Sequence, residues 1–341
     1  MKNYLVVGAG FAGAVYAYEL AQAGHRVTVI DRRDHIAGNC YDFVNEHGIL
    51  IHQYGPHIFH TSNADVVNWL GQFTEWTPYQ HKVKAKISPT ELYPLPINRV
   101  ASSVFSKEEI LSIFFRRYTL KMWGLPIEKL NPSILQRVPI RDDDNELYFP
   151  NDEFQFMPKL GYTEIFKRIL AHPHIKVITQ QTFDKSMETS YDFVFNSMAI
   201  DEYYDYQFGE LPYRSIKFET ITLPEKSIYS TATTNFTTES GPTRVTEWKN
   251  FPNTSEQARA ALKTTLTYEY PCDYKENAME RYYPVQDIDG ANKAIYQKYK
   301  EIENPKVQFI GRCGTYQYLD MHQVISSSLH GVRRFLAQQA A

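Results

Sequence analysis

Glycines near the start of the chain have the spacing of a dinucleotide-binding turn. Residues 4–7 (YLVV) predict a short buried strand, and the motif GAGFAG at 8–13 follows directly and opens a small-residue helix. A second apolar strand over 27–30 ends at Asp31. In this order the first glycine permits a tight turn, the second lets a pyrophosphate approach the backbone, and the third lets helix and strand pack closely. The helix start attracts phosphate and Asp31 can bind a ribose hydroxyl, so a dinucleotide site is predicted.

The segment after Asp31 favours FAD over NAD. Residues 31–39 (DRRDHIAGN) contain an acid, then basic residues, then a glycine-containing turn. This order resembles that of FAD-binding proteins of the two-dinucleotide-domain type, and NAD dehydrogenases usually lack the continuation. We therefore expect FAD as a tightly held cofactor, with Arg32, Gly38 and Asn39 among its contacts.

Composition restricts the function classes. The 341 residues are 22% charged and 43% hydrophobic with a net charge of -3, which suits a globular protein without a basic surface for nucleic acid. No apolar run is long enough to cross a bilayer and no signal-peptide pattern begins the chain, so we expect a cytoplasmic protein without membrane insertion. Cys40, Cys272 and Cys313 are too far apart for a metal or redox motif, and no histidine–carboxylate pattern suggests a metal.

The predicted elements describe an α/β protein whose cofactor domain is discontinuous. Strands are expected at 192–196 and 307–311, and Asp320 is expected to cap a final helix to about residue 337. We predict an FAD-binding Rossmann-like domain with an inserted mixed β-sheet domain and a small helical domain. The FAD-binding domain is expected to comprise 1–75, 186–215 and 305–341, the helical segment 95–137, and the sheet domain 76–94, 138–185 and 216–304.

Two helix starts are predicted from capping residues. Ser106-Lys107-Glu108-Glu109 forms a capping box, which predicts an amphipathic helix to about Thr119. Ser62 is expected to cap a helix over 63–73. A hairpin is predicted over 41–51, and loops are predicted at 54–60 and 138–158.

Seven segments, spread in order over nearly the whole chain, match one enzyme family. They are YGPHIFHT (54–61), YTLKMWG (118–124), RVPIR (137–141), YDYQFGELPYRSIKFE (204–219), TRVTEWK (243–249), YYPV (282–285) and GRCGTYQYLDMHQVIS (311–326). On these segments the chain resembles the UDP-galactopyranose mutases, flavoenzymes that interconvert the pyranose and furanose forms of sugar nucleotides.

The resemblance implies an isomerase with reduced FAD. In the family, N5 of the reduced flavin attacks the anomeric carbon, displaces the nucleoside diphosphate, and allows the sugar ring to open and reclose. The implied substrate is UDP-galactopyranose or a related UDP- or dTDP-sugar, and NAD(P)H or another reductant would keep the flavin reduced. The furanose product would feed polysaccharide biosynthesis, and a homodimer is an option by analogy.

The resemblance also assigns residues to the diphosphate and the sugar. Arg137 and Arg244 match the two family arginines that contact the diphosphate, with Arg137 on a lid, and a guanidinium suits charge that develops on a leaving group. Trp123 matches a tryptophan near the sugar. The tyrosines at the contact positions are Tyr118, Tyr148, Tyr283 and Tyr318.

Further residues match the flavin site. His60 matches a histidine near N5, so it is a catalytic candidate, although the flavin itself can shuttle the proton and a packed loop histidine is an equal interpretation. Arg312 matches an arginine at the polar edge of the flavin. The full set of expected cofactor contacts is Gly8, Gly10, Phe11, Ala12, Gly13, Asp31, Arg32, Gly38, Asn39, His57, Arg312, Tyr318, Asp320 and Met321.

Departures from the family pattern suggest an altered substrate. The helical lid segment between Leu95 and Tyr118 is shorter than in the family, so neither the lid nor the dimer carries over directly. Leu120 and Met122 replace polar residues, and smaller changes occur at Ala37, 196–197 and 314–315. We expect retained ring contraction on a different sugar nucleotide, such as a deoxy, N-acetyl or thymidine-linked one.

Two other functions are compatible with the fold. An FAD-dependent oxidoreductase of the amine-oxidase-like class would consume an electron acceptor and present an apolar tunnel. A non-catalytic nucleotide-binding protein would bind FAD without turnover. Paired arginines and many tyrosines suit a diphosphate and argue against the oxidoreductase.

Overall fold

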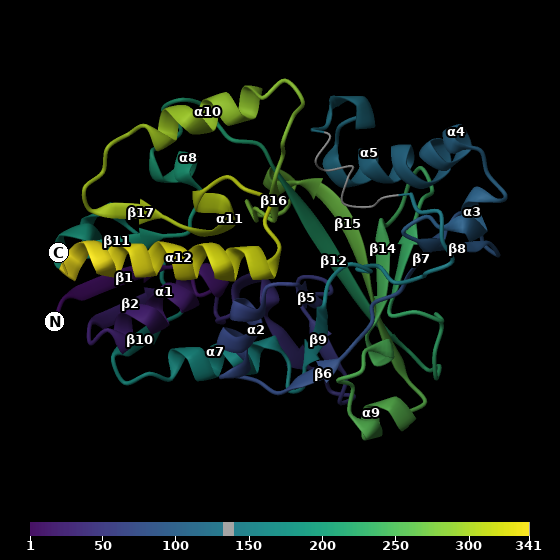
Figure 1. Ribbon diagram of the computed structural model, residues 1–341, viewed down its shortest axis with the longest axis horizontal. Helices are drawn as coiled ribbons and strands as arrows, with labels where there is room; N and C mark the ends of the chain where they lie inside the picture. The colour runs from purple at the N-terminus through teal and green to yellow at the C-terminus, as the bar shows by residue number, and fades with distance from the viewer. Residues whose placement is uncertain (132–139, 341) are drawn as a thin grey trace.

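The computed structural model describes residues 1–131 and 140–340, and its N-terminal fingerprint lies in a parallel sheet. Five strands, all parallel to their neighbours, follow the order β10-β2-β1-β11-β17. Their bounds are β1 (Asn3–Val7), β2 (Arg26–Ile30), β10 (Ile175–Ile178), β11 (Phe193–Asn196) and β17 (Val307–Phe309). Both chain termini lie at the end of the molecule that contains this sheet (Figure 1). The predicted discontinuous Rossmann-like domain is thereby confirmed.

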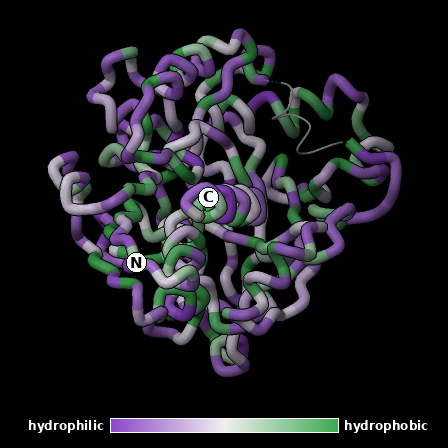
Figure 2. The backbone as a smooth tube through the Cα atoms, turned by 60° about the vertical axis from the view of Figure 1, so that its left-hand side comes forward, coloured by the Kyte–Doolittle hydropathy of each residue, from purple (hydrophilic) through white to green (hydrophobic). Residues whose placement is uncertain are grey.

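Helices bury both faces of this sheet. Tyr4 and Val6 of β1 face one core, and Leu5 and Val7 face another, as strand alternation requires. The first core is covered by α1 (Phe11–Gln22), α2 (Ala64–Gly71), α7 (Tyr162–Leu170) and α12 (Met321–Ala340). Figure 2 views α12 nearly end-on, with other elements surrounding it. Near the second face lie α8 (Ile200–Tyr203), α10 (Ala291–Lys300) and α11 (Gly311–Gly314).

A larger sheet forms the other half of the molecule (Figure 1). Its seven strands follow the order β16-β12-β15-β14-β13-β7-β8, and only β7 and β13 pair in parallel, so the predicted mixed sheet is confirmed. Their bounds are β7 (Val83–Lys86), β8 (Leu92–Leu95), β12 (Tyr213–Leu223), β13 (Thr233–Phe236), β14 (Arg244–Glu247), β15 (Thr264–Asp273) and β16 (Tyr283–Pro284).

Two small sheets complete the strands. The predicted hairpin is formed by β3 (Asp42–Val44) and β4 (Leu50–His52). The strand β9 (Phe154–Pro158) pairs with both β5 (Phe59–Thr61) and β6 (Trp76–Pro78). The two regions that we expected to be loops, 54–60 and 138–158, therefore each contribute residues to a strand, and Phe59 lies opposite Phe156 where they pair.

The helical segment contains one long helix with a wide turn. It runs through α4 (Lys107–Ile110), the π-helical η2 (Leu111–Arg116) and α5 (Arg117–Trp123). Ser106 and Glu109 form the predicted capping box. Buried residues recur at 110, 114 and 122–123, a spacing longer than the 3.6 residues of an α-turn, and the π turn keeps them on one side. The remaining helical elements are α3 (Arg99–Ser102), α9 (Glu256–Ala260), η1 (Gly38–Cys40), η3 (Ile127–Lys129), η4 (Lys185–Ser190), η5 (Trp248–Asn250) and η6 (Tyr274–Glu276).

Local details differ from the sequence predictions. We expected 138–185 in the sheet domain, yet β10 pairs with β2 and α7 packs on the first core, so this part joins the parallel sheet. Asn63 rather than Ser62 caps α2, because its side chain accepts the N–H groups of Asp65 and Val66. Among the described residues, no helix has the length and apolar character that a bilayer crossing needs.

Substituting Gly13 tests how tightly α1 packs on the turn that follows β1. A Cβ at Gly13 would overlap the carbonyl oxygen of Gly8, whereas a Cβ at Gly71 in α2 meets no atom within 4 Å. We predict that Gly13→Ala lowers the free energy of unfolding by about 3 kcal/mol. The control Gly71→Ala is expected to raise it by about 0.5 kcal/mol. Urea unfolding checks both values, and equal effects of the two substitutions would contradict the packing.

Candidate active site

The glycine-rich turn presents bare backbone at the start of α1. Gly8 has a φ of 98° and donates its N–H to the Ile30 carbonyl at 2.8 Å. A Cβ at Gly38 would lie 3.0 Å from the Cα of Gly10, so two backbone segments meet here without side chains. Phe11 and Ala12, which begin α1, are buried. The arrangement leaves the N-terminus of α1 open to an anionic group.

Asp31 fixes this turn from the end of β2. Its carboxylate accepts the N–H of Ala9 at 2.8 Å and the N–H of Arg33 at 3.0 Å. A carboxylate has about four acceptor positions, so further positions are available to a ribose hydroxyl. Asn39 accepts from the Arg33 guanidinium at 3.0 Å, which places it beside the same turn. Ala37, where the family usually has glycine, adopts a φ of 76°, a conformation that favours glycine.

Arg244 and Glu269 form a buried ion pair on the large sheet. The two residues lie directly opposite each other on β14 and β15, and Arg244 Nε is 3.2 Å from Glu269 Oε2. The Glu269 side chain is 2% exposed. Burial raises the pKa of Glu269 and the Arg244 charge opposes that rise. Because a buried charge without a partner is costly, the pair holds the Arg244 guanidinium in place.

Aromatic side chains from four distant segments surround this pair. The ring centroids of Trp123 and Tyr283 are 4.8 Å apart, and those of Trp123 and Tyr318 are 5.5 Å apart. Burial raises the pKa of Tyr118, with the charge of Arg244 opposing and Tyr148 adding to the rise, so these side chains share one environment. The structure thus brings together the predicted tyrosines, Trp123 and Arg244.

Arg312 contributes a second buried cation. Its guanidinium lies 5.3 Å from the Tyr318 ring centroid and 5.8 Å from that of Tyr282. Its Nε and Nη2 atoms are buried and have no hydrogen-bond partner among the described residues. A buried guanidinium with unpaired donors requires an acceptor, which an anionic ligand would supply. The residues present therefore fit a negatively charged cofactor edge.

The 54–58 loop crosses between the two arginines. His57 is neutral, because burial lowers its pKa to about 3, and the charges of Arg312 and Arg244 also lower it. Its Nδ1 lies 2.8 Å from the Gly55 carbonyl oxygen, and its backbone N–H donates to Nδ1 of His52 at 3.1 Å. A Cβ at Gly55 would lie 3.1 Å from Glu269 Oε1, so the loop passes close to the ion pair.

His60 occupies a packed position beside this loop. Its Nδ1 lies 2.6 Å from Asp152 Oδ2, and its ring stacks on Phe149 with centroids 3.5 Å apart. One ring face and one nitrogen therefore have structural partners, and the His322 ring lies nearby in a T-shaped arrangement with centroids 5.5 Å apart. A direct catalytic role for His60 stays a prediction.

The remaining predicted residues lie in different parts of the structure. Tyr283 is fully buried and its hydroxyl donates to the Met122 carbonyl, so that hydroxyl already has an acceptor. Asp320 directly precedes α12, and the thiol of Cys40 lies 3.6 Å from the Met321 sulfur. Arg137 falls outside the described residues. Among residues 1–131 and 140–340, no three His, Cys, Asp or Glu side chains are arranged to hold a metal.

Three neighbours of the site were missed by the sequence analysis. Glu269 lies in an alternating strand, and only its register opposite Arg244 reveals it. His81 is buried beside the Tyr148 ring, with centroids 5.8 Å apart, and burial and the Arg244 charge lower its pKa to about 3. Tyr282 donates its hydroxyl to the Tyr54 carbonyl at 2.6 Å. Tyr282 belongs to the YYPV segment that matches the family, and that match could have identified it as a residue of the site.

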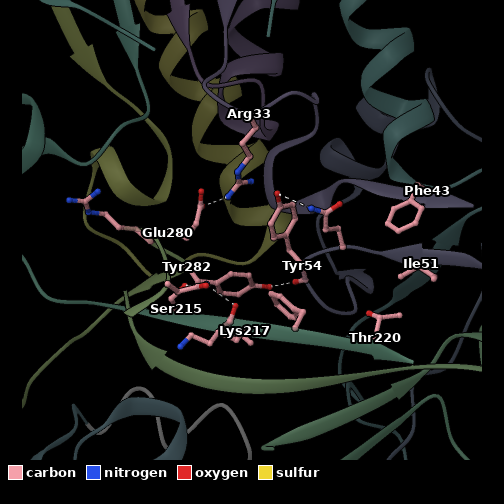
Figure 3. Close-up of a pocket in the computed structure, with 14 residues that line it drawn as sticks. Arg33, Phe43, Ile51, Tyr54, Ser215, Lys217, Thr220, Glu280 and Tyr282 are labelled. Atoms are coloured by element: carbon pink, nitrogen blue, oxygen red, sulfur yellow. Dashed lines mark hydrogen bonds and ion pairs between the residues drawn. The ribbon is translucent and has the colours of Figure 1, made fainter. Parts of the chain in front are cut away.

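A cavity of about 440 Å³ borders the site behind Tyr282 (Figure 3). Tyr54, Phe218 and Tyr282 give it aromatic walls, and Arg33, Lys217 and Glu280 add charge. Tyr282 is shared with the arginine cluster, because the charges of Arg312 and Arg244 both act on its hydroxyl. Tyr282 is therefore part of the cavity lining and also lies within the influence of Arg244 and Arg312.

Removing the partner of Arg244 is expected to destabilise the fold. Glu269→Gln leaves the Arg244 guanidinium, whose side chain is only 26% exposed, without its counter-charge, so we predict a loss of about 3 kcal/mol in the free energy of unfolding at neutral pH. The matched control is Glu239→Gln, whose pair with Arg117 has side-chain exposures of 76% and 50% and is expected to lose less than about 0.5 kcal/mol. A loss for Glu269→Gln no larger than the control's would contradict the buried pair.

Buried histidines are expected to weaken the fold in mild acid. The pKa values of His52, His57 and His81 are lowered to about 3, mainly by burial. Below about pH 6.5 the unfolded chain binds protons that the folded chain excludes, so stability falls as pH falls, by about 1.4 kcal/mol per pH unit for each histidine. His52→Gln, whose amide oxygen can accept the His57 N–H, should reduce that slope by one histidine's share. Urea unfolding at several pH values measures it, and a slope changed equally by the exposed control His330→Gln would contradict the assignment.

The match to known proteins covers the whole chain. The family model described as UDP-galactopyranose mutase matches residues 113–318, and one described as an NAD(P)-binding Rossmann-like domain matches 6–73. The chain is 36% identical to a probable UDP-galactopyranose mutase of Klebsiella pneumoniae, across 99% of this chain and 96% of that protein. It is 33% identical to a dTDP-fucopyranose mutase of Escherichia coli, across 98% and 99% of the two chains.

Solved structures agree on the fold. A crystal structure of reduced UDP-galactopyranose mutase superposes with a TM-score of 0.77 at 17% identity, covering 99% of this chain and 96% of that one. A putative protoporphyrinogen oxidase from Exiguobacterium sp. 255-15 superposes with a TM-score of 0.65 at 10% identity, covering 99% of both chains. From the family match and the full-length identity, the chain belongs to the UDP-galactopyranose mutase family.

Proposed function

We propose that this protein interconverts the pyranose and furanose forms of a nucleoside-diphosphate hexose with the help of reduced FAD. The observation that carries the proposal is the convergence of Arg244 and Arg312 with a set of buried and partly buried tyrosines next to the glycine-rich turn. Family membership supports the same chemistry.

The arginine–tyrosine arrangement suits a diphosphate leaving group. Glu269 holds the Arg244 guanidinium in a fixed position, so its remaining N–H groups can donate to phosphate oxygens in the fork geometry that phosphate favours. Tyr118 and Tyr148 can each donate one hydroxyl without adding charge. Burial raises the pKa of Tyr118, so its hydroxyl stays protonated as a donor at neutral pH. Arg137, outside the described residues, is proposed as the second diphosphate ligand.

The proposed FAD site uses the N-terminal turn and Arg312. Gly8, Gly10 and the start of α1 would hold the pyrophosphate, and Asp31 would bind the adenosine ribose. Reduced flavin supplies the nucleophile for the anomeric carbon. Arg312 would donate its unpaired N–H groups to the anionic edge of the reduced ring, and Trp123 would shield the site from water. NAD(P)H or a separate reductase is proposed as the electron source.

Met122, which replaces a polar residue of the family pattern, lies beside the proposed site. It is 8% exposed and packs with Trp123 and Tyr283, whereas the side chain of Leu120 on the same helix is exposed. An apolar side chain where the family has a polar one favours a sugar with less hydroxyl surface, such as a deoxyhexose. The Escherichia coli relative named for dTDP-fucopyranose is consistent with this direction.

An oxidoreductase remains the alternative from the fold alone. Putrescine oxidase superposes with a TM-score of 0.60 at 12% identity, a likeness that concerns the fold. Two arginines at the site do not suit an amine or an apolar substrate, because a cationic substrate would be repelled and an apolar one would leave the buried nitrogen atoms of Arg312 without an acceptor.

Chromatography of a substrate panel tests the proposal. Protein reduced anaerobically with dithionite should convert UDP-galactofuranose or dTDP-fucofuranose to the pyranose form, the favoured direction, so that even weak activity is visible. Arg244→Lys keeps the charge but loses the fork, and we expect its kcat/KM to fall by about a hundredfold. Conversion of no sugar nucleotide by FAD-loaded, reduced protein would overturn the proposal.

Substituting Met122 tests the assignment of substrate preference. We predict that Met122→Gln changes the ratio of kcat/KM for the dTDP-deoxysugar over the UDP-hexose by about three- to tenfold, toward the UDP-hexose. The control Leu120→Gln restores polarity at an exposed position of the same helix and should leave the ratio within about twofold of that of the unaltered protein. Equal ratios for both variants would contradict a role for Met122.

A further inference from the structure

Four consecutive residues, Glu280 to Tyr283, tie together four different parts of the molecule. Glu280 pairs with Arg32 and Arg33, which follow β2, and Arg281 pairs with Glu202 in α8 at 2.6 Å. Tyr282 donates to the Tyr54 carbonyl, and Tyr283 donates to the Met122 carbonyl. We call residues 280–283 the strap. It leads directly into β16 of the large sheet and contacts the parallel-sheet half through its first three members.

Glu280 is the member that reaches the cofactor-binding segment. Its two carboxylate oxygens accept separately, from Arg32 Nη2 at 3.0 Å and from Arg33 Nη2 at 2.6 Å. Figure 3 shows Arg33 lying between Glu280 and Tyr54, and its guanidinium is 4.3 Å from the Tyr54 ring centroid. Although burial raises the pKa of Glu280, the charges of Arg33 and Arg32 hold it below its usual range. Glu280 is thus a carboxylate that bridges two cations.

The two arginines that Glu280 bridges stand next to the predicted ribose-binding acid. Arg32 directly follows Asp31, whose place at the end of β2 is that of the ribose-binding acid in dinucleotide folds. Arg33 also donates to Asn39, on the far side of the glycine turn. Glu280, nearly 250 positions away in sequence, is therefore paired with the segment that directly follows the predicted ribose-binding acid.

The loop that carries Glu280 is held in an unusual conformation. Ala278 and Met279 both have positive φ angles, 50° and 61°, which non-glycine residues rarely adopt. Neighbouring contacts have to compensate for this strain, and Asn277 supplies some by donating to the Ser215 hydroxyl and the Ile216 carbonyl. The strain is consistent with a loop whose geometry serves to present Glu280.

We propose that Glu280 is a cofactor-retention residue, which acts through Arg32 and Arg33 to close the adenosine end of the FAD site. When both ion pairs are formed, they connect the cofactor domain to the segment that leads into the large sheet, across the path by which the adenosine would leave. FAD then dissociates only when both pairs break. This inference rests on the proposed FAD site and adds to it a residue that touches neither the flavin nor the sugar.

The dissociation rate of FAD tests the proposal. Oxidised holoenzyme is diluted into an excess of an apoprotein that binds FAD tightly and specifically, and the release of FAD is followed by the change in flavin fluorescence. Glu280→Gln should release FAD about five- to tenfold faster than the unaltered protein, because two partly exposed ion pairs are lost. The matched control is Glu276→Gln, an exposed residue four positions earlier that forms no ion pair with another described residue, and it should leave the rate unchanged.

Salt and a second background separate retention from a general loosening of the fold. The ratio of the two release rates should fall toward one as ionic strength rises to about 1 M, because salt screens the ion pairs. In protein that already carries Arg32→Gln and Arg33→Gln, Glu280→Gln should have no further effect. Two results would overturn the inference. One is an FAD release rate of Glu280→Gln that is within about twofold of the rate of the unaltered protein. The other is an equal acceleration by Glu280→Gln in protein that already lacks both arginines. Unaltered protein that binds no FAD would overturn the proposed function as well.

Discussion

Buried positive charge at the junction of the two sheets is the constraint on which this structure depends. Arg244 has a carboxylate partner in Glu269, and Arg312 has two buried nitrogen atoms without one. The neighbouring histidines His57 and His81 stay neutral and add no charge, because burial lowers the pKa of each to about 3. Burial of unpaired charge costs several kcal/mol, so the junction is stabilised when an anion enters it. A diphosphate and an anionic reduced flavin are the anions that the surrounding groups fit.

The two sheets contribute different parts of this junction. The parallel sheet supplies the glycine-rich turn, and the antiparallel register of β14 and β15 sets Arg244 directly against Glu269. The 54–58 loop lies between them, and Gly55 is required there because a side chain would press on Glu269. The strap adds further contacts between the two halves, since its residues bind the end of β2, α8, the 54–58 loop and the long helix. The site is therefore a product of the interface and not of either sheet alone.

Local signals in the sequence were sufficient for the parts of the fold that depend on neighbours in the chain. The glycine turn with Asp31, the capping box at Ser106 and the discontinuous Rossmann-like domain are confirmed. Family resemblance located Arg244 and Arg312, which the structure places around one loop. Pairings between distant segments were not predictable in this way. The membership of β10 in the parallel sheet, the partner of Arg244 and the contact of Glu280 with Arg32 all depend on register or on loop geometry that periodicity does not encode.

The central claim is that the flavin acts in its reduced form without net oxidation. The most direct test incubates one FAD-loaded preparation with UDP-galactofuranose or dTDP-fucofuranose under anaerobic conditions, once oxidised and once reduced, and measures product and flavin absorbance together. The account predicts many turnovers for each reduced flavin, no change in the reduced spectrum and no product from the oxidised sample. Equal product from oxidised protein, or one reduced flavin oxidised for each product molecule, would contradict it.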